Sequence, residues 1–376
     1  MSLNLKQKIT HNFLNIQGWH TNRKIVVIES DDWGSIRMPS KEVYNSLVKA
    51  GINIKDDPYN KYDSLASEED LAFLFEVLSS FKDKNGNSPV ITANCVVANP
   101  DFEKIKASGY GEYHYELVTD TLKRYPCHAD SFNLWKEGNS NKIFHPQFHG
   151  REHVHVERWL TMLQKNNKSI KIAFDLGLFG LVSPHESEIE NNCMVALDYE
   201  TIQQKDLQAQ SIIDGLNIFE QLFSYRSKSF IAPSYTWHSD LNQTLKQAGI
   251  DYLQGISYQD EPNTDNNINR RIFHYTGQKN KYGQSYLVRN CHFEPSQSQN
   301  SNNVDDCLHR MSIAFRWHKP AIISSHRLNF IGFIDPKNRD RNLPLLAELL
   351  KEILKRWPDV EFMSSDQLGE LMENKS

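Results

Sequence analysis

Short segments of this sequence concentrate carboxylates and imidazoles, the side chains that bind metal ions and move protons. The segment IESDDWG, residues 28–34, places Asp31 and Asp32 side by side at the end of an apolar run. Adjacent ionised carboxylates repel each other unless they are hydrogen-bonded, exposed or neutralised by a cation. In an extended chain they also point to opposite sides, which suits two different chemical roles. A metal or acid–base site is one interpretation of this strand end, and a solvated turn is the other.

The segment HPQFHGREHVH, residues 145–155, supplies partners for such a site. His149 and His153 lie four residues apart, so on a helix or tight turn their rings can converge on one ion. His145 and His149 have the same spacing, so spacing by itself leaves both pairs open. Gly150 and the strand before it favour His149 and His153 as the ligands, with the other histidines of the segment as supporting or core groups.

Two later strand ends carry further candidates. In FIAPSYTW, residues 230–237, a proline ends the strand and presents Tyr235 and Trp237, rings of the kind that stack on sugar faces. Packing of these rings in the core is the alternative. In SSHRLNF, residues 324–330, His326 directly follows a buried strand, which is a suitable position for a general acid or base.

The chemistry of these segments depends on elements that bring strand ends together. Apolar runs rich in Val and Ile are typical of strands buried on both faces, and they alternate with amphipathic segments that indicate helices. The expected strands are 24–30, 89–97, 142–148, 169–175, 229–232, 252–256, 286–293, 321–325 and 360–363. The expected helices are 41–50, 67–81, 152–164, 201–225, 240–247, 305–317 and 343–356.

This alternation predicts an α/β fold with a mainly parallel sheet, open or closed into a barrel. In both architectures the working residues lie at the carboxyl ends of the strands. No repeat or charge block divides the chain, so we expect one domain over residues 1–376. Residues 1–20 are expected to form a helical extension, and the polar stretches 259–269 and 296–306 are expected to be long surface loops.

Composition excludes several classes of protein. With 39% hydrophobic residues, 24% charged residues and a net charge of -5, the chain lacks the basic excess of a nucleic-acid-binding protein. No apolar run approaches the roughly 20 residues of a membrane span, and the N-terminus is polar where a signal peptide is apolar. We therefore expect a cytoplasmic protein without a transmembrane segment. The 5 cysteines include no C-x-x-C pair, which favours reduced structural thiols.

Taken in order, the four segments resemble the motifs of the polysaccharide deacetylases, which include chitooligosaccharide and peptidoglycan N-acetyl deacetylases. The family motifs are T-F-D-D-G, H-[ST]-x-x-H, R-x-P-Y and L-x-x-H. The matching segments here are E-S-D-D-W-G (29–34), H-G-R-E-H (149–153), A-P-S-Y (232–235) and I-S-S-H (323–326). The resemblance covers the chain from about residue 24 to residue 368 and implies a distorted (β/α)7 barrel.

The resemblance also implies an activity and a role for each matching residue. The family removes acetyl groups from N-acetylated sugars or polysaccharides with a divalent metal, and an O-acetylated substrate is a related case. Carried over by position, Asp31 is the catalytic base and His326 the acid, while Asp32, His149 and His153 hold the metal. Zinc is the first choice for this ligand set, with cobalt, nickel or iron compatible. A carbohydrate is the implied partner, and an intracellular precursor of a surface polysaccharide suits the expected location.

Around this centre, the resemblance implies residues that contact the substrate. Trp33 stands between the Asp pair and Gly34, where the family has Gly directly, so its ring is expected to border and reshape the cleft. A backbone N–H near Ser234 or Tyr235 is expected to face the oxyanion, and Trp237 to contact sugar.

Two supporting residues of the family are missing from their usual positions. Phe230 and Ile231 stand where the third motif has its arginine, which orients the base, and Arg151 or Arg327 are the candidate replacements. The acidic residue that tunes the catalytic histidine is not placed by any motif. Asp260 and Glu294 are candidates for it.

Two rival functions use the same residues differently. H-G-R-E-H also fits H-x-x-E-H, the inverted zinc-metallopeptidase signature, with Glu152 as base. That interpretation needs a continuous helix and leaves the Asp pair and His326 without a role. The second rival is a non-catalytic carbohydrate-binding protein on the same fold, with Trp33, Tyr235 and Trp237 as sugar platforms.

Overall fold

The computed structural model describes residues 10–181, 193–263, 269–297 and 302–374. Within them the predicted α/β fold is confirmed, and the strands of the main sheet pair in parallel. The strands of this sheet are β1 (Lys24–Trp33), β2 (Ile91–Cys95), β5 (Phe144–Phe148), β6 (Ser229–Ile231), β7 (Tyr252–Gly255), β10 (Ser285–Val288), β11 (Cys291–His292), β12 (Ala321–His326) and β13 (Val360–Met363).

The sheet curls so that one segment of chain joins its two ends. Its order is β10-β7-β6-β5-β2-β1-β12-β11, and β13 pairs with the first part of β1. Strands β10 and β11 are separated only by Arg289 and Asn290, and they pair with β7 and β12 respectively. Counting β10 and β11 as one position, the ring has the number of strands that a (β/α)7 barrel requires. The distortion lies at Arg289 and Asn290, where the chain changes its partner strand: the N–H of Arg289 bonds the carbonyl of Gly255 in β7 at 2.8 Å, and the N–H of Asn290 bonds the carbonyl of Ile322 in β12 at 3.1 Å.

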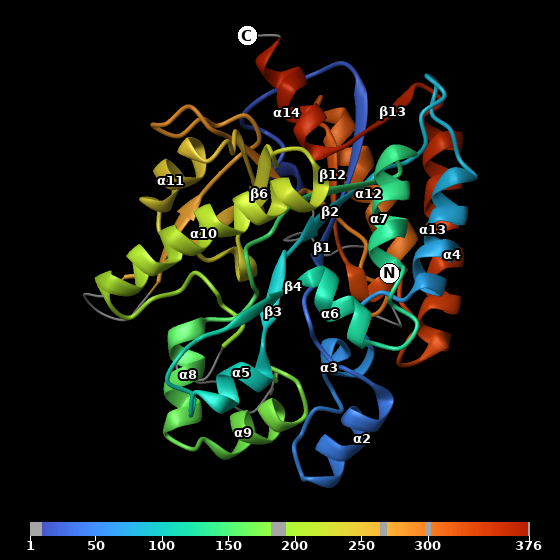
Figure 1. Cartoon of the computed structure of the whole chain (residues 1–376). Helices are drawn as coiled ribbons and strands as arrows, with labels where there is room; N and C mark the ends of the chain where they lie inside the picture. The colour runs from blue at the N-terminus through green and yellow to red at the C-terminus, as the bar shows by residue number, and fades with distance from the viewer. Residues whose placement is uncertain (1–9, 182–192, 264–268, 298–301, 375–376) are drawn as a thin grey trace.

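Helices surround the sheet on its outer side, with α4, α7 and α13 gathered on one flank and α10 and α11 on the other (Figure 1). The longer helices are α2 (Lys41–Lys49), α4 (Glu68–Ser79), α7 (Ser131–Ser140), α8 (Val156–Gln164), α9 (Lys168–Asp175), α10 (Ile202–Phe223), α12 (Asn303–Arg316), α13 (Pro336–Arg356) and α14 (Ser365–Glu373). The short elements are α3 (Pro58–Tyr62), α5 (Phe102–Ala107), α6 (Val118–Arg124), α11 (Leu241–Gln247), η2 (Pro233–Tyr235), η3 (Arg327–Asn329) and the antiparallel pairs β3 (Ala98–Pro100) with β4 (Tyr115–Leu117) and β8 (Tyr258–Glu261) with β9 (Arg270–Phe273). None of the described helices combines the length and apolar character needed to cross a membrane.

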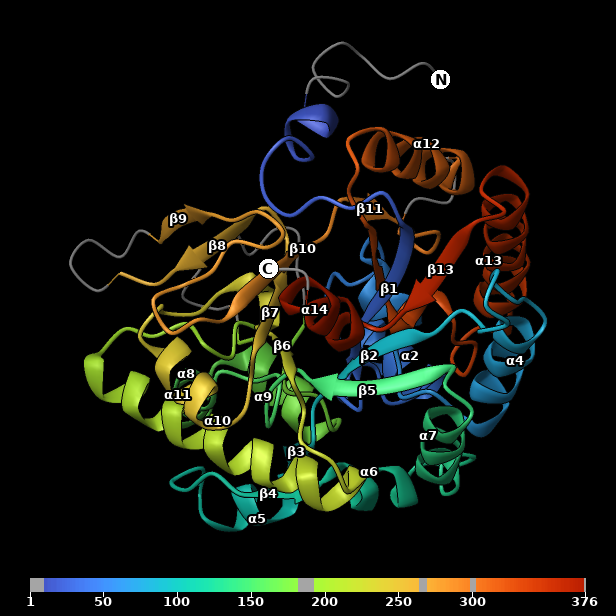
Figure 2. The same cartoon turned by 90° about the horizontal axis from the view of Figure 1, so that it is seen from above.

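Helix α14 closes the end of the barrel where the strands begin, and Figure 2 shows it over the centre of the ring. Leu368 and Met372 of this helix pack with Ile25 and Val27 of β1. Burial of such apolar side chains contributes about 1.5–3 kcal/mol each. The amino ends of the strands are therefore sealed, and the carboxyl ends are left for a functional site.

One expected strand is wrong. Residues 169–175 belong to helix α9, because Asn167 caps its first turn by accepting a hydrogen bond from the N–H of Ile170. The buried residues Ile170, Ala173 and Phe174 lie at helical spacing, which the apolar content of the segment had disguised.

The expected loops and extension are described only in part. The stretch 259–269 begins inside strand β8, and residues 264–268 lie outside the described residues. The stretch 296–306 runs into α12 at Asn303, with 298–301 outside the description. Residues 10–13 are helical, and residues 1–9 are not described. A single domain spanning the whole chain stays a prediction.

Candidate metal centre

Strand β1 delivers its carboxylates through a bulge. The register between β1 and β2 shifts between Ser30 and Trp33, and Asp32 adopts a left-handed backbone conformation with φ of 72°. A bulge re-aims side chains, so the neighbouring carboxylates leave the strand in different directions. Gly34 completes the turn, because its φ is +82° and a Cβ there would lie 2.8 Å from the carbonyl oxygen of Val96.

The bulge brings Asp32 to the two histidines expected as its partners. Among the described residues, one group of three has the arrangement of a metal site, and it is Asp32, His149 and His153, whose ligand atoms lie within 4.8 Å of one another. Oδ1 of Asp32 lies 3.5 Å from Nε2 of His149 and 3.3 Å from Nε2 of His153. Both histidines lie in the turn between β5 and α8 and not on a helix.

The hydrogen bonds of His149 prepare it as a ligand. Its Nδ1 lies 2.9 Å from the carbonyl oxygen of Ile231 and donates to it, which fixes the tautomer and leaves Nε2 with a lone pair. That Nε2 is buried and makes no hydrogen bond. A buried imidazole lone pair without a donor, aimed at a carboxylate, fits a divalent cation such as zinc.

The charges of the other two residues also suit a cation. Burial opposes ionisation of Asp32, but Arg37, His149 and His153 outweigh it and hold the pKa of Asp32 well below its usual range. Burial, together with the charge of Arg37, lowers the pKa of His153 to about 4, so its ring is neutral at pH 7. An ionised carboxylate and neutral imidazoles are the forms that bind metal.

Asp31 lies inside the barrel and is held by an arginine that no motif indicated. Its two oxygens each accept a hydrogen bond of 2.6 Å from the guanidinium of Arg289, and Oδ1 also accepts one of 2.8 Å from Asn94. Burial raises the pKa of Asp31, but the paired Arg289 dominates the balance and lowers it to about 2. Asp31 is therefore an ionised, oriented carboxylate beside the metal triad.

Arg289 is itself clamped by a second buried carboxylate. Its Nε donates to Oε2 of Glu29 at 2.6 Å, and Oε1 of Glu29 accepts from the hydroxyl of Ser365 at 2.7 Å. Arg289 and Glu29 are fully buried, so every donor and acceptor between them needs a partner. The distorted position between β10 and β11 thus supplies the residue that orients Asp31.

His326 faces Asp31 from the end of β12. Its Nε2 lies 3.8 Å from Oδ2 of Asp31, and its Nδ1 lies 2.6 Å from Oε1 of Glu294. Burial alone favours the neutral ring, but Glu294 and the Asp pair raise the pKa of His326 to about 9. The imidazole of His326 is therefore protonated at neutral pH. The Tyr59 ring packs against this imidazole edge to face, with 5.4 Å between the ring centroids.

The two arginines expected to orient the base are placed elsewhere, which corrects that expectation. The guanidinium of Arg151 bonds Glu152 and Asp214, and that of Arg327 bonds Asp63. Arg289 carried one sequence signal, since it follows the apolar run YLV directly and so stands at a strand end. Of the two acidic candidates, Glu294 contacts His326, whereas Asp260 pairs with Arg271.

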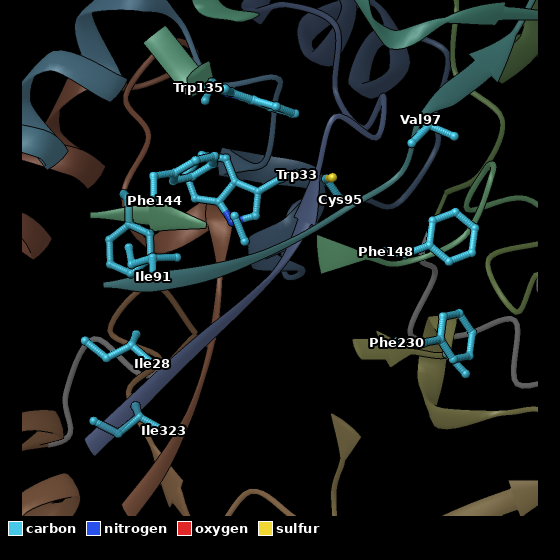
Figure 3. Packing of buried hydrophobic residues seen from close by; sticks show 14 of the residues in the cluster. Ile28, Trp33, Ile91, Cys95, Val97, Trp135, Phe144, Phe148, Phe230 and Ile323 are labelled. Atoms are coloured by element: carbon cyan, nitrogen blue, oxygen red, sulfur yellow. The ribbon is translucent and has the colours of Figure 1, made fainter. Parts of the chain in front are cut away.

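Trp33 does not border the site, which corrects a second expectation. Its side chain is 0% exposed and packs edge-on against Phe144 and Trp135, with ring centroids 4.8 and 6.3 Å away (Figure 3). Its indole N–H donates to the hydroxyl of Ser30 at 3.0 Å. The bulge at Asp32 explains the difference, because the extra residue turns the next side chain toward the helix-covered face of the sheet.

The segment 233–237 also departs from its expected contacts. Trp237 is 3% exposed and donates its indole N–H to Asn242, so it is a core residue and not a sugar platform. The backbone N–H of Tyr235 bonds the carbonyl of Ala232 at 3.0 Å and is not free for an oxyanion. The Tyr235 hydroxyl instead accepts from Arg289 at 3.1 Å. Ser234 is exposed, with a left-handed φ of 55°.

The inverted metallopeptidase geometry is not present. Helix α8 begins at Val156, after both histidines, so the motif H-G-R-E-H does not form one helical face. The carboxylate of Glu152 is engaged by Arg151 at 2.6 Å and by the hydroxyl of Ser211 at 3.0 Å. Glu152 is thus tied to a salt bridge and does not act as an open base.

No family model and no curated protein matches the chain. Among solved structures it is similar to a protein described as a polysaccharide deacetylase from Mycobacterium smegmatis, with 10% identity, coverage of 96% of this chain and 93% of that chain, and a TM-score of 0.48. It is also similar to Puue allantoinase (10% identity, 94% and 91% covered, TM-score 0.44) and to the peptidoglycan deacetylase PdaC from Bacillus subtilis (10% identity, 94% and 94% covered, TM-score 0.38). Two of these three proteins are described as deacetylases.

Proposed function

We propose that the protein is a metal-dependent hydrolase that removes an acetyl group from an N-acetylated, or O-acetylated, sugar or polysaccharide precursor. One observation carries the proposal. Beside the Asp32, His149 and His153 triad, Oδ2 of Asp31 and Nε2 of His326 lie 3.8 Å apart, and each of the two groups has its own counter-charge, Arg289 for Asp31 and Glu294 for His326. These counter-charges lower the pKa of Asp31 and raise that of His326, which is the pattern of an acid–base pair.

A divalent ion held by the triad would supply a Lewis acid for the acyl carbonyl and lower the pKa of water toward roughly 7. Asp31 lies next to the triad, but its carboxylate is bonded to Arg289 and Asn94 and is not one of the metal-binding groups. It therefore serves as the base that accepts the proton of the attacking water. Arg289 and Asn94 hold the carboxylate in one orientation, which lowers the cost of reaching the reactive geometry.

His326 supplies the proton that the leaving amine requires. It is protonated at neutral pH because Glu294 stabilises the imidazolium, and its Nε2 faces the same space as Asp31. The amide nitrogen leaves poorly until it is protonated, so cleavage needs an acid that faces this nitrogen. This division of labour gives Asp31 and His326, the two titratable groups beside the triad, separate chemical tasks.

The proposal is tested on the purified protein by metal analysis and by acetate release from a panel of acetamido sugars. We expect bound zinc or another divalent metal, and acetate release that a chelator abolishes and added metal restores. Stoichiometric metal with no acetate release from any sugar, ester or oligosaccharide would favour the non-catalytic carbohydrate-binding alternative. Failure to bind any divalent metal would contradict the proposed function.

A further inference from the structure

The two oxygens of Asp32 have different neighbours. Oδ1 faces Nε2 of His149 and of His153, at 3.5 and 3.3 Å. Oδ2 accepts a hydrogen bond of 3.1 Å from Nη2 of Arg37. One oxygen therefore faces the metal-binding histidines, and the other is already engaged by a cation.

Arg37 is held in this position by a chain of buried charges. Its Nε lies 3.6 Å from Oδ2 of Asp63, and Oδ1 of Asp63 accepts two hydrogen bonds from Arg327, of 3.0 and 2.9 Å. Arg327 also donates to the carbonyl of Ser35 at 2.9 Å, in the turn that leads to Arg37. The side chains of Asp63 and Arg327 are 0% exposed and that of Arg37 is 13% exposed. Acidic and basic side chains thus alternate in the order Asp32, Arg37, Asp63 and Arg327, and each one is paired with the next.

This charge chain constrains how Asp32 can bind a cation. A carboxylate binds a metal through one oxygen or through both, and a guanidinium on the second oxygen competes with the two-oxygen mode. The same guanidinium places a positive charge next to the ligand, which repels a divalent ion and withdraws electron density from the carboxylate. Both effects weaken the hold on the ion while leaving it a stronger Lewis acid.

We propose that Arg37 is a positioning residue that occupies Oδ2 of Asp32, restricts this carboxylate to one metal bond and lowers the affinity of the centre for its ion. The inference rests on the proposed function, because it assumes that the triad holds a divalent metal. It also assigns a role to Arg327, which acts on the metal centre through Asp63 and Arg37 and does not orient Asp31.

The test measures metal affinity in the full-length protein stripped of metal, by competition for Zn²⁺ with a chromophoric chelator. Arg37→Met is expected to bind Zn²⁺ about tenfold or more tightly than the wild type, because a repulsive charge is lost and the second oxygen is freed. Arg37→Lys, which keeps the charge, is expected to stay within about threefold of the wild type. The Co²⁺ absorption spectrum should change in Arg37→Met, since the coordination by Asp32 changes, and should stay close to wild type in Arg37→Lys.

Two further variants make the result interpretable. Arg339 is a matched control, since its side chain is 6% exposed and pairs with Asp70 away from the site, so Arg339→Met should leave Zn²⁺ affinity unchanged. Asp63→Asn provides a second reading if Arg37→Met does not fold, and it should weaken Zn²⁺ binding because Arg37 then has Asp32 as its sole counter-charge. Equal or weaker affinity in folded Arg37→Met, or unchanged affinity in Asp63→Asn, overturns the inference. Wild-type protein that binds neither Zn²⁺ nor any other divalent metal instead overturns the proposed function on which the inference rests.

Discussion

The Nδ1 atom of His326 lies 2.6 Å from Oε1 of Glu294, and this contact decides the charge of the imidazole. The second oxygen of Glu294 accepts a hydrogen bond of 2.6 Å from Asn329, so the carboxylate is fixed at both oxygens. A fixed carboxylate on Nδ1 holds the ring orientation and stabilises the protonated form. Glu294 therefore sets both the direction and the pKa of the group that faces Asp31.

Replacing Glu294 is expected to move the alkaline limb of activity. His326 acts as an acid in its protonated form, so turnover is present below its pKa and is lost as pH rises through about 9. In Glu294→Gln the stabilising charge is gone, so the pKa of His326 should fall and the loss of activity should occur about 1 to 2 pH units lower than in the wild type. The measurement is kcat/KM for acetate release from about pH 6 to about pH 10, the range in which the wild type and Glu294→Gln are expected to differ.

A carboxylate outside the site serves as the control for this pH profile. Glu361 pairs with Arg23 near the sealed end of the barrel, so Glu361→Gln should leave the alkaline limb in place. If Glu294→Gln keeps the wild-type limb, another group sets the acid pKa and the assignment of His326 is wrong.

The adjacent residues Asp31 and Asp32 are expected to fail in different ways. Asp32 faces the histidines, so Asp32→Asn should lose bound metal and activity together. Asp31 is bonded to Arg289 and Asn94, so Asp31→Asn should retain metal while kcat falls by about 100-fold or more, the loss typical of a missing general base. Metal content and single-turnover acetate release distinguish the two, and equal metal loss in both variants would contradict the division of roles.

Strand ends were predictable from the sequence because buried parallel strands leave a strong signal. Asp31 and His326 each follow a short apolar run, 25–28 and 321–323, within a few residues, and the structure brings both residues to the same mouth of the barrel. The register between β1 and β12 places Asp31 directly beside His326, which follows from the parallel order of these strands. Chemistry-bearing residues that end strong strands could therefore be found without the structure.

Residues outside the motifs were harder to predict, for physical reasons that differ. Arg289 acts at the interruption between β10 and β11, and pairing across a barrel depends on the closure of the whole sheet. The turn of Trp33 away from the site depends on a bulge at Asp32, and a left-handed conformation at an aspartate leaves no pattern in hydrophobicity. Arg37 is held beside Asp32 by Asp63, which pairs with Arg327, and these residues are far apart in the sequence.

Removing Arg289 is expected to affect both stability and the acidic limb of activity. Arg289→Met leaves Glu29 and Asp31 buried without their cation, which costs about 3–5 kcal/mol of unfolding free energy. Asp31 works as an ionised base, so activity is present above its pKa and is lost as pH falls through it. In the wild type that pKa is about 2, and without Arg289 the acidic limb should move to higher pH.

Urea unfolding measures the effect of Arg289 on stability. The pH dependence of kcat/KM between about pH 4 and about pH 8, where the domain is expected to stay folded, measures its effect on the acidic limb of activity. Arg289→Lys keeps a charge but loses the paired hydrogen bonds, so its acidic limb should move less than that of Arg289→Met. A large loss of stability with an unmoved acidic limb would show that Arg289 supports the fold and does not tune Asp31.

Trp33 is expected to matter for stability and not for substrate recognition. Its ring is fully buried between Trp135 and Phe144, so Trp33→Ala should lower the unfolding free energy by about 3–5 kcal/mol. Trp33→Phe keeps most of the apolar volume, and it should fold and show a wild-type KM, because no face of the indole reaches the site. Phe273 is 70% exposed, and Phe273→Ala is the matched aromatic control, with a change within about 0.5 kcal/mol. A raised KM in a Trp33→Phe protein of near-normal stability would instead place this ring at the substrate, as its position beside the Asp pair first suggested.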